Sequence, residues 1–158
     1  IYPWAFVANV ISVVEYGVEH RPCGVLSGDA WHRGPVILSW EDSEYADRID
    51  GHNLVIHEFV HKLDMLNGKA NGFPPLHRHM DPALWSSACS EAFGDLKQKM
   101  QSKSELPIDA YALNSPAEFF AVCSEVFFER PHIVKQFYPN VYQQFSLFYQ
   151  QDPATRLF

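Results

Sequence analysis

The spacing of apolar residues divides the sequence into two parts. Residues 5–16 and 34–40 are short apolar runs, rich in β-branched residues and bounded by turn-forming ones, which is typical of β-strands. From residue 50 onward, apolar residues recur at the three- and four-residue spacing of helices. The pattern therefore predicts an α+β fold, in which a small N-terminal β-sheet is followed by about four helices.

Capping residues indicate where these helices begin and end. Asn67-Gly68 is a good C-terminal stop, and prolines at first-turn positions or just past a helix end mark other boundaries. The predicted helices are 50–66, one that opens at Asp81-Pro82, 115–130, and one that begins near Pro139. The buried face predicted for the second helix carries Leu84, Ala88, Ala92, Phe93, Leu96 and Met100.

Length and composition limit the possible classes of protein. A chain of 158 residues suits one domain, 1–158, with a hydrophobic core of its own. The net charge of -7 argues against a nucleic-acid partner, and no run of 18 apolar residues predicts a membrane span. The three cysteines, Cys23, Cys89 and Cys123, form no C-x-x-C motif, which indicates reduced thiols of a cytosolic protein, with Cys123 buried on a helix.

The segment HEFVH at residues 57–61 is the strongest chemical signal. On a helix, His57 and His61 lie one turn apart on the same face and can bind one metal ion, while Glu58 can reach water bound to that ion. Apolar neighbours predict that this helix is buried; they are Leu54, Phe59, Val60, Leu63 and Leu66. The alternative is a buried helix whose two histidines only hydrogen-bond to backbone or carboxylate groups.

A catalytic zinc site needs a third protein ligand. A histidine at the close spacing of metzincins is missing, because Asp64 and Asn67 stand where Gly and His would be. The candidates elsewhere are His77, His79, Glu118, Glu125 and Glu129. Glu118 also completes a capping box with Ser115, so its spacing alone does not decide between helix cap and metal ligand.

Three segments carry a resemblance to a known family: GHNLVIHEFVHKLD (51–64), DAYALNSPAEFFAVCSEVFFE (109–129) and FSLFYQQDP (145–153). They resemble the Mlc titration factor A family of bacterial zinc peptidases over most of the chain. The resemblance implies a gluzincin-like, zincin-type core similar to the anthrax lethal factor peptidase domain. It also implies that Glu118 is the third ligand of one zinc ion and that Tyr111 serves catalysis.

The same resemblance implies a cytoplasmic protein with aminopeptidase-type activity on peptide substrates. In the best-known members it implies an interaction with the glucose-responsive repressor Mlc. Members of that family usually carry an additional N-terminal portion, which we expect this chain to lack.

Two functions of different classes follow from these observations. In the first, the chain is a zinc-dependent peptidase in which Glu58 is the general base and Tyr111 donates to the developing oxyanion. In the second, it is a protein-interaction module that sequesters an Mlc-like transcriptional repressor, and zinc is structural or vestigial. Glu58 and Tyr111 favour the enzyme, because neither is needed merely to hold a fold.

Several nearby residues have supporting roles that the sequence leaves open. Asp64 either orients a ligand histidine, forms a salt bridge or is solvated at the helix C-terminus. Asp109 and Asn114 flank Tyr111 and could also orient it. His52 lies off the ligand face and is expected to pack or to cap. Residues 34–40 are expected to border the substrate cleft, where a strand edge could pair with an extended peptide.

Overall fold

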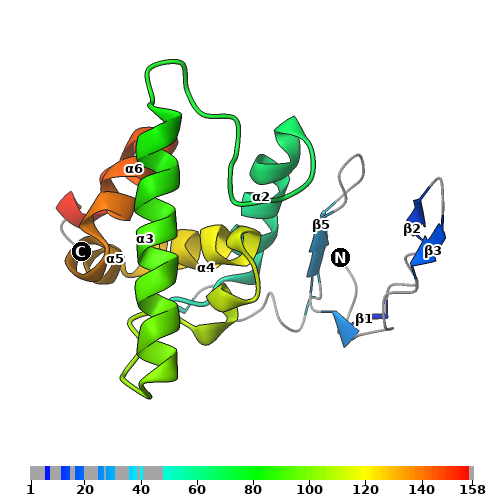
Figure 1. Cartoon of the computed structure of the whole chain (residues 1–158), viewed down its shortest axis with the longest axis horizontal. Helices are drawn as coiled ribbons and strands as arrows, with labels where there is room; N and C mark the ends of the chain where they lie inside the picture. Colours follow the sequence, from blue (N-terminus) through cyan, green and yellow to red (C-terminus); the bar gives the residue numbers. More distant parts are fainter. Residues whose placement is uncertain are drawn as a thin grey trace.

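The computed structural model describes the strand residues 6–7, 12–14, 17–19, 25–26, 28–30 and 36–38, residue 40, and residues 48–156. Figure 1 shows short strands in the first third of the chain and helices in the rest, which agrees with the α+β pattern of the sequence. Among the described residues, no helix combines the length and the apolar character that a bilayer span requires.

The described strands form three separate antiparallel pairs. The pairs are β1 (Phe6–Val7) with β4 (Val25–Leu26), β2 (Ser12–Val14) with β3 (Gly17–Glu19), and β5 (Gly28–Ala30) with β6 (Val36–Leu38). A single N-terminal sheet is therefore not confirmed among the described residues. Strands β1 and β2 fall in the predicted run 5–16 and β6 falls in 34–40, while the other residues of both runs lie outside the described part.

Five α-helices follow in the described part of the chain, one more than predicted. They are α2 (Leu54–Asp64), α3 (Pro82–Gln101), α4 (Pro116–Glu129), α5 (Pro131–Phe137) and α6 (Pro139–Tyr149). There are also three short 3₁₀ segments among the described residues: η1 (Met65–Asn67) after α2, η2 (Ala110–Leu113) before α4, and η3 (Pro153–Thr155) after α6. The helix that the sequence did not predict is α5. Pro131 was interpreted only as the end of the preceding helix, but it is also the first residue of α5, a position that proline favours.

The predicted helix ends are largely confirmed by capping contacts. The Asp81 side chain accepts a hydrogen bond from Ala83 N at 2.8 Å, and α2 runs through η1 to Gly68, as the Asn67-Gly68 signal predicted. The start of the first helix was predicted four residues too early. Asn53 is the true N-cap, since its side chain accepts from Ile56 N at 3.0 Å and the preceding Gly51 has φ of 92°.

Aromatic side chains fill the core between α3, α4 and α6. The Trp85 ring lies with its centroid 5.4 Å from those of Phe120, Phe145 and Phe148. The prediction for α3 was only partly right, because Leu84 and Met100 are exposed. The buried residues of α3 are Trp85, Ala88, Ala92 and Leu96.

Helix α2 lies between α4 and the β5–β6 pair (Figure 1). The expectation that its apolar residues are buried was wrong for Phe59, Leu63 and Leu66, which are exposed, whereas Val60 is buried. The helix also buries two carboxylates, those of Glu58 and Asp64. Strand β6 packs near this helix, as the cleft hypothesis requires; pairing of its edge with a peptide stays a prediction.

Candidate metal centre

Two helices bring the three predicted ligands together. Helix α2 carries His57 and His61, and α4 carries Glu118. The Nε2 atoms of the two histidines are 3.1 Å apart, and Glu118 Oε2 lies 3.0 Å from His57 Nε2 and 3.3 Å from His61 Nε2. The three ligand atoms therefore form a nearly equilateral triangle.

This triangle fits a zinc ion. Ligands about 2.0–2.1 Å from a tetrahedral ion are separated by about 3.3 Å, close to the distances seen here. Glu118 Oε2 is enclosed and finds no hydrogen-bond partner of good geometry among the described residues. Two imidazole nitrogens that face each other beside a buried carboxylate need a shared proton or a cation between them. The donor set, two imidazoles and one carboxylate, is one that zinc accepts in catalytic sites.

The choice between cap and ligand for Glu118 is resolved by the local geometry. Ser115 Oγ accepts from Glu118 N at 3.2 Å, so the serine caps α4 through the glutamate's backbone. The Glu118 carboxylate does not complete the capping box and points at the histidines instead. Capping of α4 by Ser115 therefore leaves the Glu118 side chain available as a metal ligand.

The charges of the site are strongly coupled when no metal is bound. Burial lowers the pKa of His57, but the close contacts and negative charges of the Glu118 and Glu125 carboxylates outweigh it and raise this pKa to about 9. Burial raises the pKa of Glu118, but its contacts with His57 and His61 outweigh it and lower this pKa to about 2. At neutral pH the metal-free site therefore holds a proton where a cation would sit.

The two predicted catalytic residues lie on α2, which carries the histidines, and on η2, which packs against α4. Glu58 follows His57 on α2 and is buried. Tyr111 lies on η2, half exposed, with its ring centroid 6.0 Å from that of His57. Burial, followed by the charges of Glu118 and Glu58, raises the pKa of Tyr111, so that its hydroxyl keeps its proton at neutral pH.

Two further carboxylates of α4 contact a ligand histidine or the residues just before α2. Glu125 Oε1 lies 2.8 Å from His57 Nδ1, and its Oε2 accepts from Asn53 N at 2.5 Å. Glu129 accepts from Gly51 N and from Asn53 Nδ2, both at 2.8 Å. Sequence reasoning considered both glutamates only as ligands and missed these contacts. The sequence did hold a signal for them: glutamates at helical spacing on an otherwise apolar helix indicate buried carboxylates that need polar partners.

The other candidates lie elsewhere or have structural roles. Asp64 Oδ2 accepts from Asn71 N at 2.8 Å and from Gly72 N at 2.7 Å, so this carboxylate holds a loop. The rings of His77 and His79 stack on each other at 5.7 Å, and His77 Nε2 lies 2.8 Å from Phe148 O rather than in the metal triangle.

The residues that flank Tyr111 form hydrogen bonds with the backbone of Tyr111. Asp109 Oδ1 accepts from Tyr111 N at 2.7 Å and caps η2, while Asn114 N donates to Tyr111 O at 3.1 Å. Both flanking residues therefore hold the segment that carries Tyr111. His52 is exposed, and it neither packs nor caps α2, because Asn53 takes the cap.

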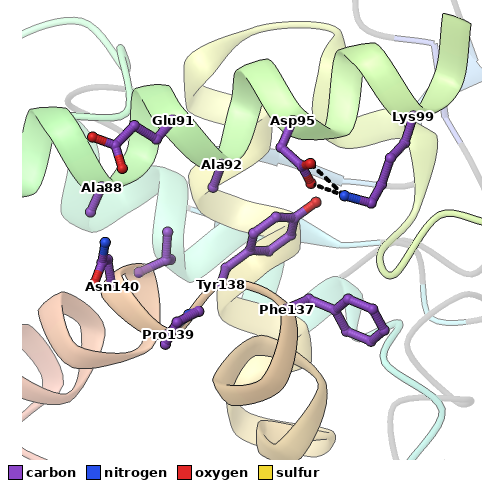
Figure 2. A pocket seen from close by; sticks show the side chains of 10 residues that line it. Ala88, Glu91, Ala92, Asp95, Lys99, Phe137, Tyr138, Pro139 and Asn140 are labelled. Carbon is purple, nitrogen blue, oxygen red and sulfur yellow. Dashed lines mark hydrogen bonds and ion pairs between the residues drawn. The ribbon is translucent and has the colours of Figure 1, made fainter.

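Two cavities occur in the described part of the chain away from the triangle. One, of about 220 Å³, lies where α3 meets the junction of α5 and α6; Figure 2 shows the Asp95–Lys99 ion pair beside Tyr138 in its wall. The other, of about 240 Å³, is lined by residues that include His52, Asp109 and Arg130. Neither is lined by a residue of the triangle, whose His57 and Glu118 side chains remain partly exposed.

An HExxH helix faced by a glutamate from a second helix defines a metallopeptidase site. Residues 1–150 match the family described as glucose-regulated metallo-peptidase M90, and the chain belongs to this family.

Curated relatives named Mlc titration factor A extend this result. The protein from Serratia proteamaculans (strain 568) is 42% identical over 160 residues, which cover 99% of this chain and 61% of the relative. The protein from Yersinia pestis (strain Pestoides F) is 41% identical, with 99% of this chain and 59% of the relative covered. The chain thus spans about three fifths of the length of these relatives.

Proposed function

We propose that this chain is a zinc-dependent peptidase, in which His57, His61 and Glu118 hold one zinc ion. The observation that carries the proposal is the triangle of ligand atoms with edges of 3.0, 3.1 and 3.3 Å. It supports a gluzincin-like ligand set on a zincin-like core. Bound zinc would acidify a water molecule and polarise the carbonyl of the peptide bond.

In this proposal Glu58 moves the proton of the reaction. Its position next to His57 on α2 supports this role, in which the carboxylate takes a proton from the attacking water. The same carboxyl then delivers the proton to the leaving amine. Burial of Glu58 keeps bulk water from competing for that proton.

In the same proposal Tyr111 stabilises negative charge on the substrate. Its hydroxyl stays protonated at neutral pH and donates to the carbonyl oxygen as charge builds there. Half of its surface is exposed beside the site, so a peptide can reach it without rearrangement of the core.

Glu58→Gln separates metal binding from chemistry. We expect the variant to keep one zinc per chain, measured by elemental analysis after dialysis, and to lose about 10²- to 10⁴-fold in hydrolysis of a fluorogenic peptide library. Glu105→Gln, an exposed site, is the control and should behave as the original protein. A Glu58→Gln variant that holds zinc and hydrolyses peptides at the original rate would disprove the role of Glu58.

We further propose an aminopeptidase-type preference and a cytoplasmic location. Both are supported by the likeness to the Mlc titration factor A family. Aminoacyl anilides and their N-acetylated forms test the first: an aminopeptidase cleaves the free amines and spares the acetylated substrates. Equal cleavage of both would indicate an endopeptidase-like preference instead.

A second candidate function is supported by the names of the relatives. Proteins called Mlc titration factor A suggest that this chain binds an Mlc-like repressor, with zinc structural or vestigial. Calorimetry with a purified Mlc-type repressor tests this. Binding together with no hydrolysis by the zinc-loaded protein would favour the second candidate, and hydrolysis without binding would favour the peptidase alone.

A further inference from the structure

Three glutamates of α4 lie in one line along the helix. At about 100° per residue, positions 125 and 129 each fall within about 20° of position 118, on opposite sides of it. Glu118 meets the two imidazoles, Glu125 meets His57 from behind, and Glu129 meets the residues just before α2. This line of carboxylates is where α4 docks against the N-terminal half of α2.

Glu125 accepts from two different groups, one with each oxygen. Oε2 accepts from the backbone N–H of Asn53, which can only donate, and Oε1 lies 2.8 Å from His57 Nδ1. The side chain is buried, so no bulk water replaces either partner. A carboxylate accepts at both oxygens, and His57 Nδ1 must therefore be the donor in this contact.

We propose that Glu125 is a positioning residue that holds His57 in the Nδ1–H tautomer, so that Nε2 presents its lone pair to the metal. This inference rests on the proposed metal site. Its physical basis is that the hydrogen bond made by one imidazole nitrogen decides which nitrogen is free to bind a metal.

Glutamine at position 125 cannot reproduce both contacts. An amide offers one acceptor oxygen and one NH₂ donor. If its oxygen accepts from Asn53 N, its NH₂ faces His57 Nδ1 and favours the tautomer with a proton on Nε2, which blocks the metal. If it flips, two N–H groups face each other at Asn53. The first arrangement lowers the affinity for the metal, and the second destabilises the N-terminus of α2.

Glu129 offers a matched control. It also accepts from two N–H donors, Gly51 N and Asn53 Nδ2, and it also tethers the N-terminus of α2. It makes no contact with an imidazole among its described interactions. Glu129→Gln therefore removes the same kind of tether without touching the tautomer of His57.

The experiment measures zinc affinity by competition with a chelator for the original protein, Glu125→Gln and Glu129→Gln. Urea unfolding of each metal-free variant reports the purely structural cost. We expect Glu125→Gln to weaken zinc binding by about 10- to 100-fold and Glu129→Gln to change it less than about threefold. Equal losses in the two variants, or unchanged affinity in Glu125→Gln, would overturn the positioning role.

A second readout needs no variant to fold. With ¹⁵N-labelled histidine, the zinc-loaded original protein should show a protonated, slowly exchanging Nδ1 and a metal-shifted Nε2 at His57. A protonated Nε2, or metal on Nδ1, would overturn the inference. If the original protein binds no zinc at all, the proposed function fails; if it binds zinc and only these results fail, Glu125 alone loses its role.

Discussion

Helix α4 has two opposite faces that hold the protein together by different physics. One face carries Phe120 and Phe127, which pack without exposure to water against aromatic rings such as those of Trp85 and Tyr142. The other face carries the three carboxylates that meet α2. Burial of the aromatic face stabilises the fold, because apolar surface is removed from water. Burial of the carboxylate face costs hydration free energy, which polar partners of the carboxylates must offset.

The comparison teaches that stability and site geometry are supplied by separate surfaces of one helix. Changes on the aromatic face should lower the free energy of unfolding and leave the affinity of the folded site for zinc intact. A change to a carboxylate that meets an imidazole should lower zinc affinity, and its effect on unfolding should be limited to the ion pair or tether that it removes. The predictions below run from the largest expected change in free energy to the smallest.

Phe127→Ala should lower the free energy of unfolding by about 3–5 kcal/mol, because it leaves a cavity in a fully buried aromatic cluster. Urea unfolding of the metal-free protein measures this, and zinc affinity of the folded fraction should not change. Leu147→Ala, at a partly exposed position of α6, is the control, with an expected loss below about 1 kcal/mol. A loss below about 1 kcal/mol for Phe127→Ala would refute the role of the aromatic face.

Glu118→Gln should weaken zinc binding by more than about 100-fold. Loss of a metal ligand should cost more affinity than loss of a residue that only orients a ligand, which costs about 10- to 100-fold. The variant should remain folded, because Ser115 still caps α4 through the backbone of residue 118. Chelator competition measures the affinity and far-ultraviolet circular dichroism checks the fold. Affinity within about tenfold of the original protein would mean that the tripod is closed by another group.

The pH dependence of stability without metal follows from the coupled pair His57 and Glu118. His57 has a pKa of about 9 in the folded chain against 6.5 unfolded, so its contribution is complete below pH 6.5 and is lost as pH rises through 9. Glu118 has a pKa of about 2 against 4.5, so its contribution is complete above pH 4.5 and is lost as pH falls through 2. The two shifts describe one interaction and are not added.

Metal-free protein should therefore lose about 2 kcal/mol of stability between pH 6.5 and pH 9, measured by urea unfolding. Glu118→Gln should show a smaller loss over the same range, because the histidine proton has lost one of its carboxylate partners. Saturating zinc should also reduce the loss, since the ion replaces the proton. Identical slopes in the three samples would show that the pair does not couple as described.

Gly72→Ala should cost about 1 kcal/mol or somewhat more in unfolding free energy. Gly72 has φ of 76°, and a Cβ there would lie 2.5 Å from Pro116 O, at the start of α4. The site should lose some zinc affinity too, because Pro116 precedes Glu118 by only two residues, about half a helical turn. Gly94→Ala, where an added Cβ meets nothing within 4 Å, is the control. Equal stability of both variants would contradict the close packing at Gly72.

Local signals allowed much of the helical part to be predicted from sequence. Caps at Asp81 and Ser115 and the Gly68 stop depend on neighbours in the chain, and all three are confirmed. The motif at His57–His61 is similarly local. The burial of α2 could not be predicted, because Phe59 and Leu66 obey helical spacing and still face outward.

The partners of the carboxylates could not be predicted from spacing for a related reason. Glu118, Glu125 and Glu129 share one face in any helix. Which of them contacts His57 Nε2, His57 Nδ1 or a backbone N–H depends on the position of α4 along α2. That docking is fixed by contacts between residues more than 60 positions apart in the chain. Glu118 was singled out by the family resemblance, while the roles of the other two required the structure.

The most direct test of the metal centre is an anomalous difference map at the zinc absorption edge from crystals of the zinc-loaded protein. The account predicts one peak about 2.0–2.2 Å from His57 Nε2, His61 Nε2 and a carboxylate oxygen of Glu118. A peak held by other side chains, or no peak while Glu118 points away from both histidines, would contradict it.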